Sequence, residues 1–252
     1  MTVVVVTDTS CRLPADLREQ WSIRQVPLHI LLDGLDLRDG VDEIPDDIHK
    51  RHATTAGATP VELSAAYQRA LADSGGDGVV AVHISSALSG GFAALAAGRA
   101  AAAGDELDTV ARAAAAAVSR IHAFVAVARL DNLRRSGRIS GAKAWLGTAL
   151  ALKPLLSVDD GKLVLVQRVR TVSNATAVMI DRVCQLVGDR PAALAVHHVA
   201  DPAAANDVAA ALAERLPACE PAMVTAMGPV LALHVGAGAV GVCVDVGASP
   251  PA

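Results

Sequence analysis

Aromatic side chains are nearly missing from this chain of 252 residues, because Phe, Trp and Tyr together make up 2% of it. Few platforms are therefore available on which nucleic-acid bases could stack. The formal net charge of −4 also gives no basic footprint for a phosphate backbone, so nucleic acid is not expected as a partner. Apolar residues nevertheless form 52% of the sequence, and any cavity must have walls of Ala, Val, Leu and Ile.

Paired cysteines are also missing, since the four that occur are scattered with no C-x-x-C spacing. They are Cys11, Cys184, Cys219 and Cys243. This pattern predicts neither a zinc site nor a disulfide framework, and it suits a reducing compartment. His49 with His52, and His197 with His198, bring no convincing third ligand at metal spacing, so no metal is expected.

Targeting and membrane segments are not expected either. The apolar run Val3–Val6 lacks a basic flank and is too short for a signal peptide, which favours a cytoplasmic protein without stable membrane insertion. Residues 223–244 are uncharged and long enough to span a bilayer, but Pro229 and the glycines among them favour strands and turns. The G-x-S-x-G, P-loop and H-E-x-x-H signatures are missing, which is weak evidence against an enzyme.

The first half of the chain alternates between short apolar runs and helical patterns. Strands are predicted at residues 3–6, 23–32 and 78–84. Helices are predicted at residues 13–21, 60–71 and 91–120, with Thr59 as the cap of the second. This alternation predicts an N-terminal α/β domain of residues 1–118, built on a mostly parallel sheet with helices.

A C-terminal domain of residues 119–252 is predicted to be a mixed α/β sandwich. Its strands are expected at residues 124–128, 155–158, 163–166, 193–197, 221–225 and 240–246. Its helices are expected at residues 172–187 and 202–216. The Asp160-Gly161 step between two apolar runs predicts a hairpin. The expected fold class is thus α/β, with two α/β domains.

Hydroxyl-rich loops follow two of the predicted strands. Asp8-Thr9-Ser10 follows the first strand, and Ser85-Ser86 follows the strand at residues 78–84. The carboxyl ends of parallel strands share one sheet edge, where ligands bind, so these loops are expected to meet there. Ordinary turn and cap chemistry is the alternative. Thr54-Thr55, just before the helix at Pro60, either serves an anion or only caps that helix.

The segment Gly236–Gly241 matches the G-x-G-x-x-G fingerprint of dinucleotide sites. That fingerprint should open a helix, whereas a Val-rich strand follows here, so we interpret the segment as a packed glycine turn beside His234. Basic and small residues also interrupt an apolar helix within residues 130–154. Part of that stretch is expected to face a partner or the domain junction.

Taken together, these motifs resemble the DegV family of fatty-acid-binding proteins. The motifs that carry the resemblance are Val5–Ser10, Val26–Leu28, Asp39–Asp42, Ala53–Thr55, His83–Gly90, Leu130–Leu133, Ser136–Ile139, Lys153–Leu155, Val169–Thr171, Gly228–Val230 and His234–Gly238. The resemblance implies two α/β domains with a long-chain fatty acid, such as palmitate or oleate, in a buried pocket between them. It also implies a lipid carrier that is not an enzyme and has no other cofactor, and whose bound carboxylate is phosphorylated by a fatty acid kinase resembling dihydroxyacetone kinases.

Site residues follow from the resemblance by position. The implied head-group contacts are Thr54, Thr55, Ser85, Ser86 and His234. Arg138 and Arg170 would face the phosphate or the docked kinase. Two departures stand out: the family pattern continues after Gly90 with a further helix and strand that are absent here, and Ala56 replaces a head-group hydroxyl.

Two other functions remain open from the residues alone. The first is an enzyme that acts on a small phosphorylated or carboxylated metabolite at the same anion site, with His234 as the one attractive general base. The second is a structural α/β protein whose pocket is filled with side chains.

Overall fold

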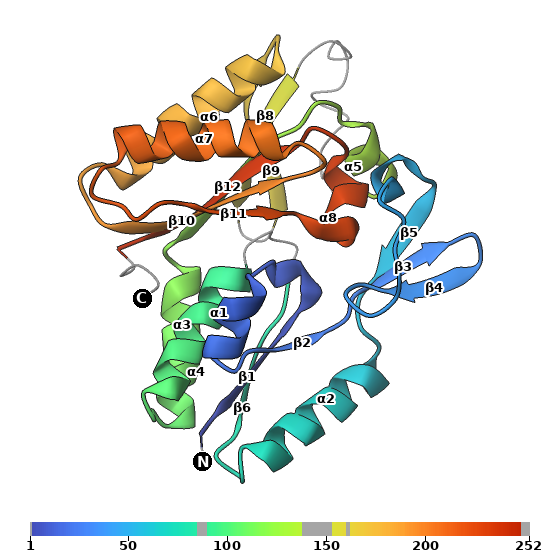
Figure 1. Cartoon of the computed structure of the whole chain (residues 1–252), viewed down its shortest axis with the longest axis vertical. Coiled ribbons are helices and arrows are strands. Elements are labelled where there is room, and N and C mark those ends of the chain that lie inside the picture. Colours follow the sequence, from blue (N-terminus) through green and yellow to red (C-terminus); the bar gives the residue numbers. More distant parts are fainter. Residues whose placement is uncertain (1, 85–89, 138–152, 160–161, 248–252) are drawn as a thin grey trace. The chain divides into compact units, whose positions relative to one another are not determined.

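A computed structural model of the chain describes residues 2–84, 90–137, 153–159 and 162–247 (Figure 1). The chain forms two compact units, which are described separately. The first unit comprises Met1–Pro45 and His52–Arg120, and the second comprises Asp46–Arg51 and Ile121–Ala252. The short segment Asp46–Arg51 thus belongs with the C-terminal half, which the sequence did not indicate. The domain limit after residue 118 stays a prediction.

A three-stranded parallel sheet organises the first unit. Its central strand is β1 (Val4–Asp8), between β2 (Arg24–Val26) and β6 (Val79–Val82). Helix α2 (Pro60–Asp73) packs against Val4 and Val6, while α3 (Gly90–Ala102) also packs against β1. Figure 1 shows α2 on one side of this sheet, with α1 (Ala15–Gln20), α3 and α4 (Leu107–Val118) on the other. The predicted parallel sheet covered by helices is confirmed.

Helix α2 begins at the predicted cap. Thr59 Oγ1 accepts a hydrogen bond from the Glu62 amide at 3.3 Å, and the Glu62 carboxylate accepts one from the Thr59 amide at 2.7 Å. This reciprocal pair is a capping box. Pro60 suits the first turn because the first N–H groups of a helix have no partner within the helix, so the missing N–H of proline costs nothing there.

The strand predicted at residues 23–32 is in fact two strands in different sheets. After β2 the chain passes Pro27, which has no N–H to give to a sheet, and continues as β3 (His29–Leu32). Strand β3 is the centre of an antiparallel sheet between β4 (Leu35–Arg38) and β5 (Ala53–Ala56). The hairpin from β3 to β4 turns at Asp33-Gly34, directly after the predicted strand ends.

The helix predicted at residues 91–120 is also divided. Helix α3 ends at Ala102, and α4 does not begin until Leu107. Gly104 lies between them at a φ of +86°, in the left-handed region that ends helices and that glycine enters at low cost. High helix propensity on both sides of this glycine therefore did not produce one helix.

A buried histidine joins the antiparallel sheet to α2. His29 Nδ1 lies 2.7 Å from Asp36 Oδ1, and its Nε2 lies 3.1 Å from Glu62 Oε2. Burial lowers the pKa of His29, but the two carboxylates outweigh it and raise this pKa above its ordinary value. The Glu62 carboxylate therefore both caps α2 and contacts His29 of β3.

The second unit contains a six-stranded mixed sheet in the order β11-β10-β12-β7-β8-β9. These strands are β7 (Ile121–Ala126), β8 (Lys153–Asp159), β9 (Lys162–Val169), β10 (Ala192–His198), β11 (Met223–Ala226) and β12 (Val240–Val246). Strands β8 and β9 pair antiparallel as predicted, while their turn at residues 160–161 lies outside the described residues. Helices α6 (Val172–Val187) and α7 (Pro202–Arg215) pack on one face of the sheet.

The opposite face of this sheet carries small and aliphatic side chains and, near the end of β12, the buried carboxylate of Asp245. Alternate residues of a strand point to opposite faces, and Val242 and Val244 of β12 belong to the core under α6 and α7. Gly241, Cys243 and Asp245 of β12, which alternate with these two valines, and their partners on neighbouring strands therefore line the other face. Among these, Ala123, Val125, Ala193, Ala195 and Cys243 are buried.

One short helix was not predicted in the uncharged segment of residues 223–244. Besides β11 and β12, this segment forms α8 (Gly228–Val235). Within the described part of the chain, no helix has both the length and the apolar character needed to cross a membrane.

Candidate functional site

The hydroxyl-rich loop after β1 meets the end of β6, as the parallel-sheet prediction required. Asp8 is the last residue of β1, and its Oδ2 accepts a hydrogen bond from the Ile84 amide at 2.7 Å. Its Oδ1 accepts one from the Ser10 amide at 3.0 Å and another from the Ser10 hydroxyl. One carboxylate therefore fixes both chain segments where they leave the sheet.

Asp8 is buried and still ionised at neutral pH. Only 2% of it is exposed, and this burial by itself raises the pKa of the carboxyl. Hydrogen bonds from His83, Ser10 and Ile84 stabilise the charged form more than burial opposes it, so the pKa of Asp8 lies below its ordinary value. Asp8 thus places a fixed negative charge beneath this edge of the sheet.

A histidine and a tyrosine extend the Asp8 network. His83 Nδ1 lies 3.3 Å from Asp8 Oδ2, and His83 Nε2 lies 2.6 Å from the Tyr67 hydroxyl. Burial and the charge of Asp8 raise the pKa of Tyr67, which keeps its proton for donation to Nε2. Both ring nitrogens of His83 are then used, so this imidazole orients the end of β6. Sequence reasoning missed Tyr67, although it is the one tyrosine of the chain.

The remaining hydroxyl of this loop, on Thr9, also has an internal role. Thr9 Oγ1 accepts a hydrogen bond from the Leu28 amide at 3.1 Å and interacts with the buried Asp39. Burial raises the pKa of Asp39, although the nearby Arg12 and the Thr9 hydroxyl oppose this. Turn and cap chemistry therefore accounts for the side chains of Thr9 and Ser10.

Thr54 and Thr55 lie in strand β5, not in a loop that caps α2. Thr54 pairs with Leu31 of β3, and Thr55 pairs with Ile30. Neighbouring strand residues point to opposite faces of a sheet, so the two hydroxyls point away from each other. Thr54 is exposed and Thr55 is half-buried beside fully buried Ile30. The two hydroxyls therefore do not lie on the same face of β5, and Thr55 is the better placed of the two, while the head-group role of these residues stays a prediction.

The other predicted site residues are only partly described. Ser85, Ser86 and Arg138 lie outside the described residues. His234 is half-buried in the last turn of α8. Arg170 is exposed between β9 and α6, next to Thr171, whose hydroxyl caps α6 by accepting from the Asn174 amide at 3.1 Å.

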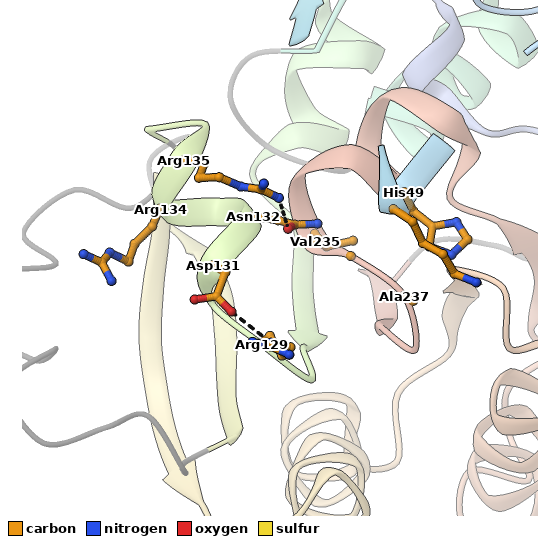
Figure 2. A pocket seen from close by; sticks show the side chains of 10 residues that line it. His49, Arg129, Asp131, Asn132, Arg134, Arg135, Val235 and Ala237 are labelled. Atoms are coloured by element: carbon orange, nitrogen blue, oxygen red, sulfur yellow. Dashed lines mark hydrogen bonds and ion pairs between the residues drawn. The ribbon is translucent and has the colours of Figure 1, made fainter. Parts of the chain in front are cut away.

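An open pocket of about 800 Å³ lies within the second unit (Figure 2). Three segments form it: the short 3-10 helix η2 (Ile48–Lys50), helix α5 (Asp131–Arg135) with the preceding Arg129, and the turn after α8. Its lining residues are His49, Lys50, Arg129, Asp131, Asn132, Arg134, Arg135, Val235, Gly236 and Ala237. The glycine turn that the sequence analysis singled out is thus one wall of a basic pocket. Within the described residues, no cluster of His, Cys, Asp and Glu could hold a metal ion.

Comparison with known proteins places the whole chain in one family. The family model described as "Uncharacterised protein, DegV family" matches residues 2–95 and 91–246. A DegV domain-containing protein of Mycobacterium tuberculosis is 90% identical over 280 aligned positions, which cover 100% of both chains. Because this chain has 252 residues, at least 28 of those positions have no residue here. The two matches to the family model overlap at residues 91–95. This overlap lies directly after Gly90, where the helix and strand of the family pattern are absent from this sequence.

Solved structures agree with this placement. A DegV family protein from Thermus thermophilus, described by its fatty acid binding, is 27% identical with a TM-score of 0.84, over 98% of this chain and 100% of that one. DegV of Bacillus subtilis, described as a fatty acid binding protein, is 25% identical with a TM-score of 0.85, over 97% and 99% of the two chains. Family model, curated relative and fold all lead to the same result: this chain belongs to the DegV family.

Proposed function

We propose that this protein binds a long-chain fatty acid such as palmitate or oleate and carries it without transforming it. The observation that carries the proposal is the match, over nearly the whole chain, to DegV proteins from Thermus thermophilus and Bacillus subtilis that are described as binding fatty acids. The energetics are favourable, since about 15 methylene groups at about 0.8 kcal/mol each supply on the order of 12 kcal/mol before association costs. A few hydrogen bonds then suffice for the head group.

The face of the six-stranded sheet opposite α6 and α7 suits an acyl tail where its side chains are small. Ala123, Ala195 and Cys243 leave room beside the strands there, and the charged Asp245 lies further along β12 on the same face. For the head group we propose Thr55, Ser85, Ser86 and His234, which offer neutral hydroxyl and imidazole groups. The oxygens of the ionised Asp8 already accept bonds from Ser10, His83 and Ile84, so Asp8 does not compete with a fatty acid for the proposed head-group donors.

Organic extraction of the purified protein is expected to release a long-chain fatty acid at close to one equivalent. Mass spectrometry of the intact protein under native conditions should show the corresponding added mass. Protein that is stripped of lipid should take up added palmitate or oleate. Repeated recovery of empty protein that also fails to take up either acid would contradict the proposal and favour a pocket filled by side chains.

We further propose that the bound carboxylate is presented to a partner fatty acid kinase, with Arg138 and Arg170 facing the phosphate or the kinase. Arg170 is exposed between two elements, as a docking contact requires. Arg170→Ala should therefore leave palmitate affinity within about twofold but slow phosphorylation of the bound acid by about tenfold. Arg168→Ala is the matched control, because Arg168 is an exposed arginine two residues earlier, within β9. If Arg170→Ala instead loses the lipid, this arginine belongs to the head-group site.

A further inference from the structure

The pocket of the second unit carries a local excess of positive charge in a chain whose net charge is −4. Four Lys or Arg side chains and a single carboxylate line it, which leaves an excess of three positive charges with histidine counted as neutral. Asp131 is engaged by Arg129, whose Nε lies 2.9 Å from Asp131 Oδ2. The only carboxylate among the lining residues is thus partly neutralised within the pocket wall.

The donors in this pocket are held by specific contacts. Arg135 donates from Nη2 to Asn132 Oδ1 at 2.7 Å, and Figure 2 shows its side chain turned toward Asn132 while Arg134 points away. With its oxygen engaged, the Asn132 amide turns Nδ2, which can only donate, toward the turn after α8. If residue 236 had a Cβ, that atom would lie 3.1 Å from Asn132 Nδ2. Because the residue is glycine, a ligand can approach this nitrogen from the side of the turn.

Two of the cationic or donor side chains arrive from far away in the sequence. Segment Asp46–Arg51 lies in the first half of the sequence but is part of the second unit of the structure, where η2 packs against α8. His49 and Lys50 of η2 thereby line the same pocket as Arg129 and Arg135. The topology therefore brings basic groups from two segments that are far apart in the sequence to one cavity.

We propose that this pocket binds small molecules that carry a di- or triphosphate group. A single carboxylate would leave most of the positive charge unmatched, whereas a di- or triphosphate carries a negative charge of about three to four, which matches the excess. The volume of about 800 Å³ is ordinary for a small-molecule site. No Phe, Trp or Tyr is among the lining residues, so recognition rests on the phosphates. The proposal does not depend on fatty acid binding.

Isothermal titration of the full chain with inorganic tripolyphosphate tests this. We expect saturable binding that weakens steeply as NaCl rises, because the contacts are exposed and screened by salt. Arg135→Glu should weaken it at least about tenfold, and Lys50→Glu, on a different segment, should do the same. Arg182→Glu is the matched control, since Arg182 is exposed on α6 of the same unit and does not line the pocket.

Each other outcome would overturn the proposal. Equal binding by Arg135→Glu and Arg182→Glu would mean only diffuse attraction to surface charge. Binding to phosphatidylglycerol vesicles or to a polyglutamate peptide, with none to tripolyphosphate, would reassign the pocket to a membrane or an acidic protein. A parallel loss of palmitate affinity in Arg135→Glu and Lys50→Glu would make it the fatty acid head-group site, whereas we expect palmitate binding to be unchanged.

Discussion

Asp8→Ala is expected to lower the free energy of unfolding by about 3 kcal/mol or more, because a buried, fully engaged carboxylate disappears. Its removal leaves the amides of Ser10 and Ile84 without their acceptor in a place that water reaches poorly. His83 also loses the group that orients its ring. Denaturant unfolding of the full chain, followed by circular dichroism, measures the loss.

The control for this variant is Asp73→Ala. Asp73 also pairs with a basic residue, since Arg24 Nη1 lies 2.6 Å from its Oδ2, but its side chain is 58% exposed. Surface pairs of this kind contribute less than about 1 kcal/mol. Similar losses in the two variants would show that the Asp8 network does not hold the edge of the sheet.

The stabilisation by Asp8 should also depend on pH in one direction. The pKa of this carboxyl is lowered in the folded protein, so its contribution is complete above the unfolded pKa of about 3.9 and is lost as the pH falls through the folded value. The stability difference between the parent protein and Asp8→Ala should therefore be constant from pH 5 to 7 and shrink below about pH 4. A difference that grows on acidification would contradict this assignment.

Local sequence signals predicted most of the fold because the relevant contacts are short-range. Thr59, Pro60 and Glu62 form a capping box within one turn, and the helix at Val172–Val187 has the predicted bounds. The edge of the parallel sheet was also predictable, since any two adjacent parallel strands bring their carboxyl ends together. The contact between Asp8 and Ile84 follows from that rule.

The errors arose where single residues or distant contacts decide the outcome. Pro27 and Gly104 interrupt segments whose composition favours continuity, so one strand and one helix each became two elements. The placement of Thr55 depends on its pairing with Ile30 in the neighbouring strand. Such a pairing joins residues far apart in the sequence, so no local sequence pattern predicts it. The basic pocket was equally invisible, because His49 and Arg135 are brought together only by the fold.

Thr55→Val and Ser86→Ala are each expected to weaken palmitate binding about tenfold to hundredfold, which corresponds to the loss of a hydrogen bond to a charged group, about 1.5–3 kcal/mol. A buried carboxylate stays ionised only where donors surround it, so each hydroxyl matters, whereas the tail contacts persist. Valine has nearly the shape of threonine and suits a strand, so the Thr55 variant should fold normally.

Strand geometry supplies the decisive control for that experiment. Thr54→Val removes a hydroxyl one residue away, but on the opposite face of β5, so it should bind palmitate like the parent protein. A fluorescent fatty acid displaced by palmitate, and then by methyl palmitate, measures both affinities on each variant. The parent should prefer the acid, and Thr55→Val should lose most of that preference, since the ester carries no charge for these donors to stabilise. If the Thr54 and Thr55 variants bind alike, or the parent prefers the ester, the head group is held elsewhere, and the hydroxyls after β6 and in β5 serve only the fold.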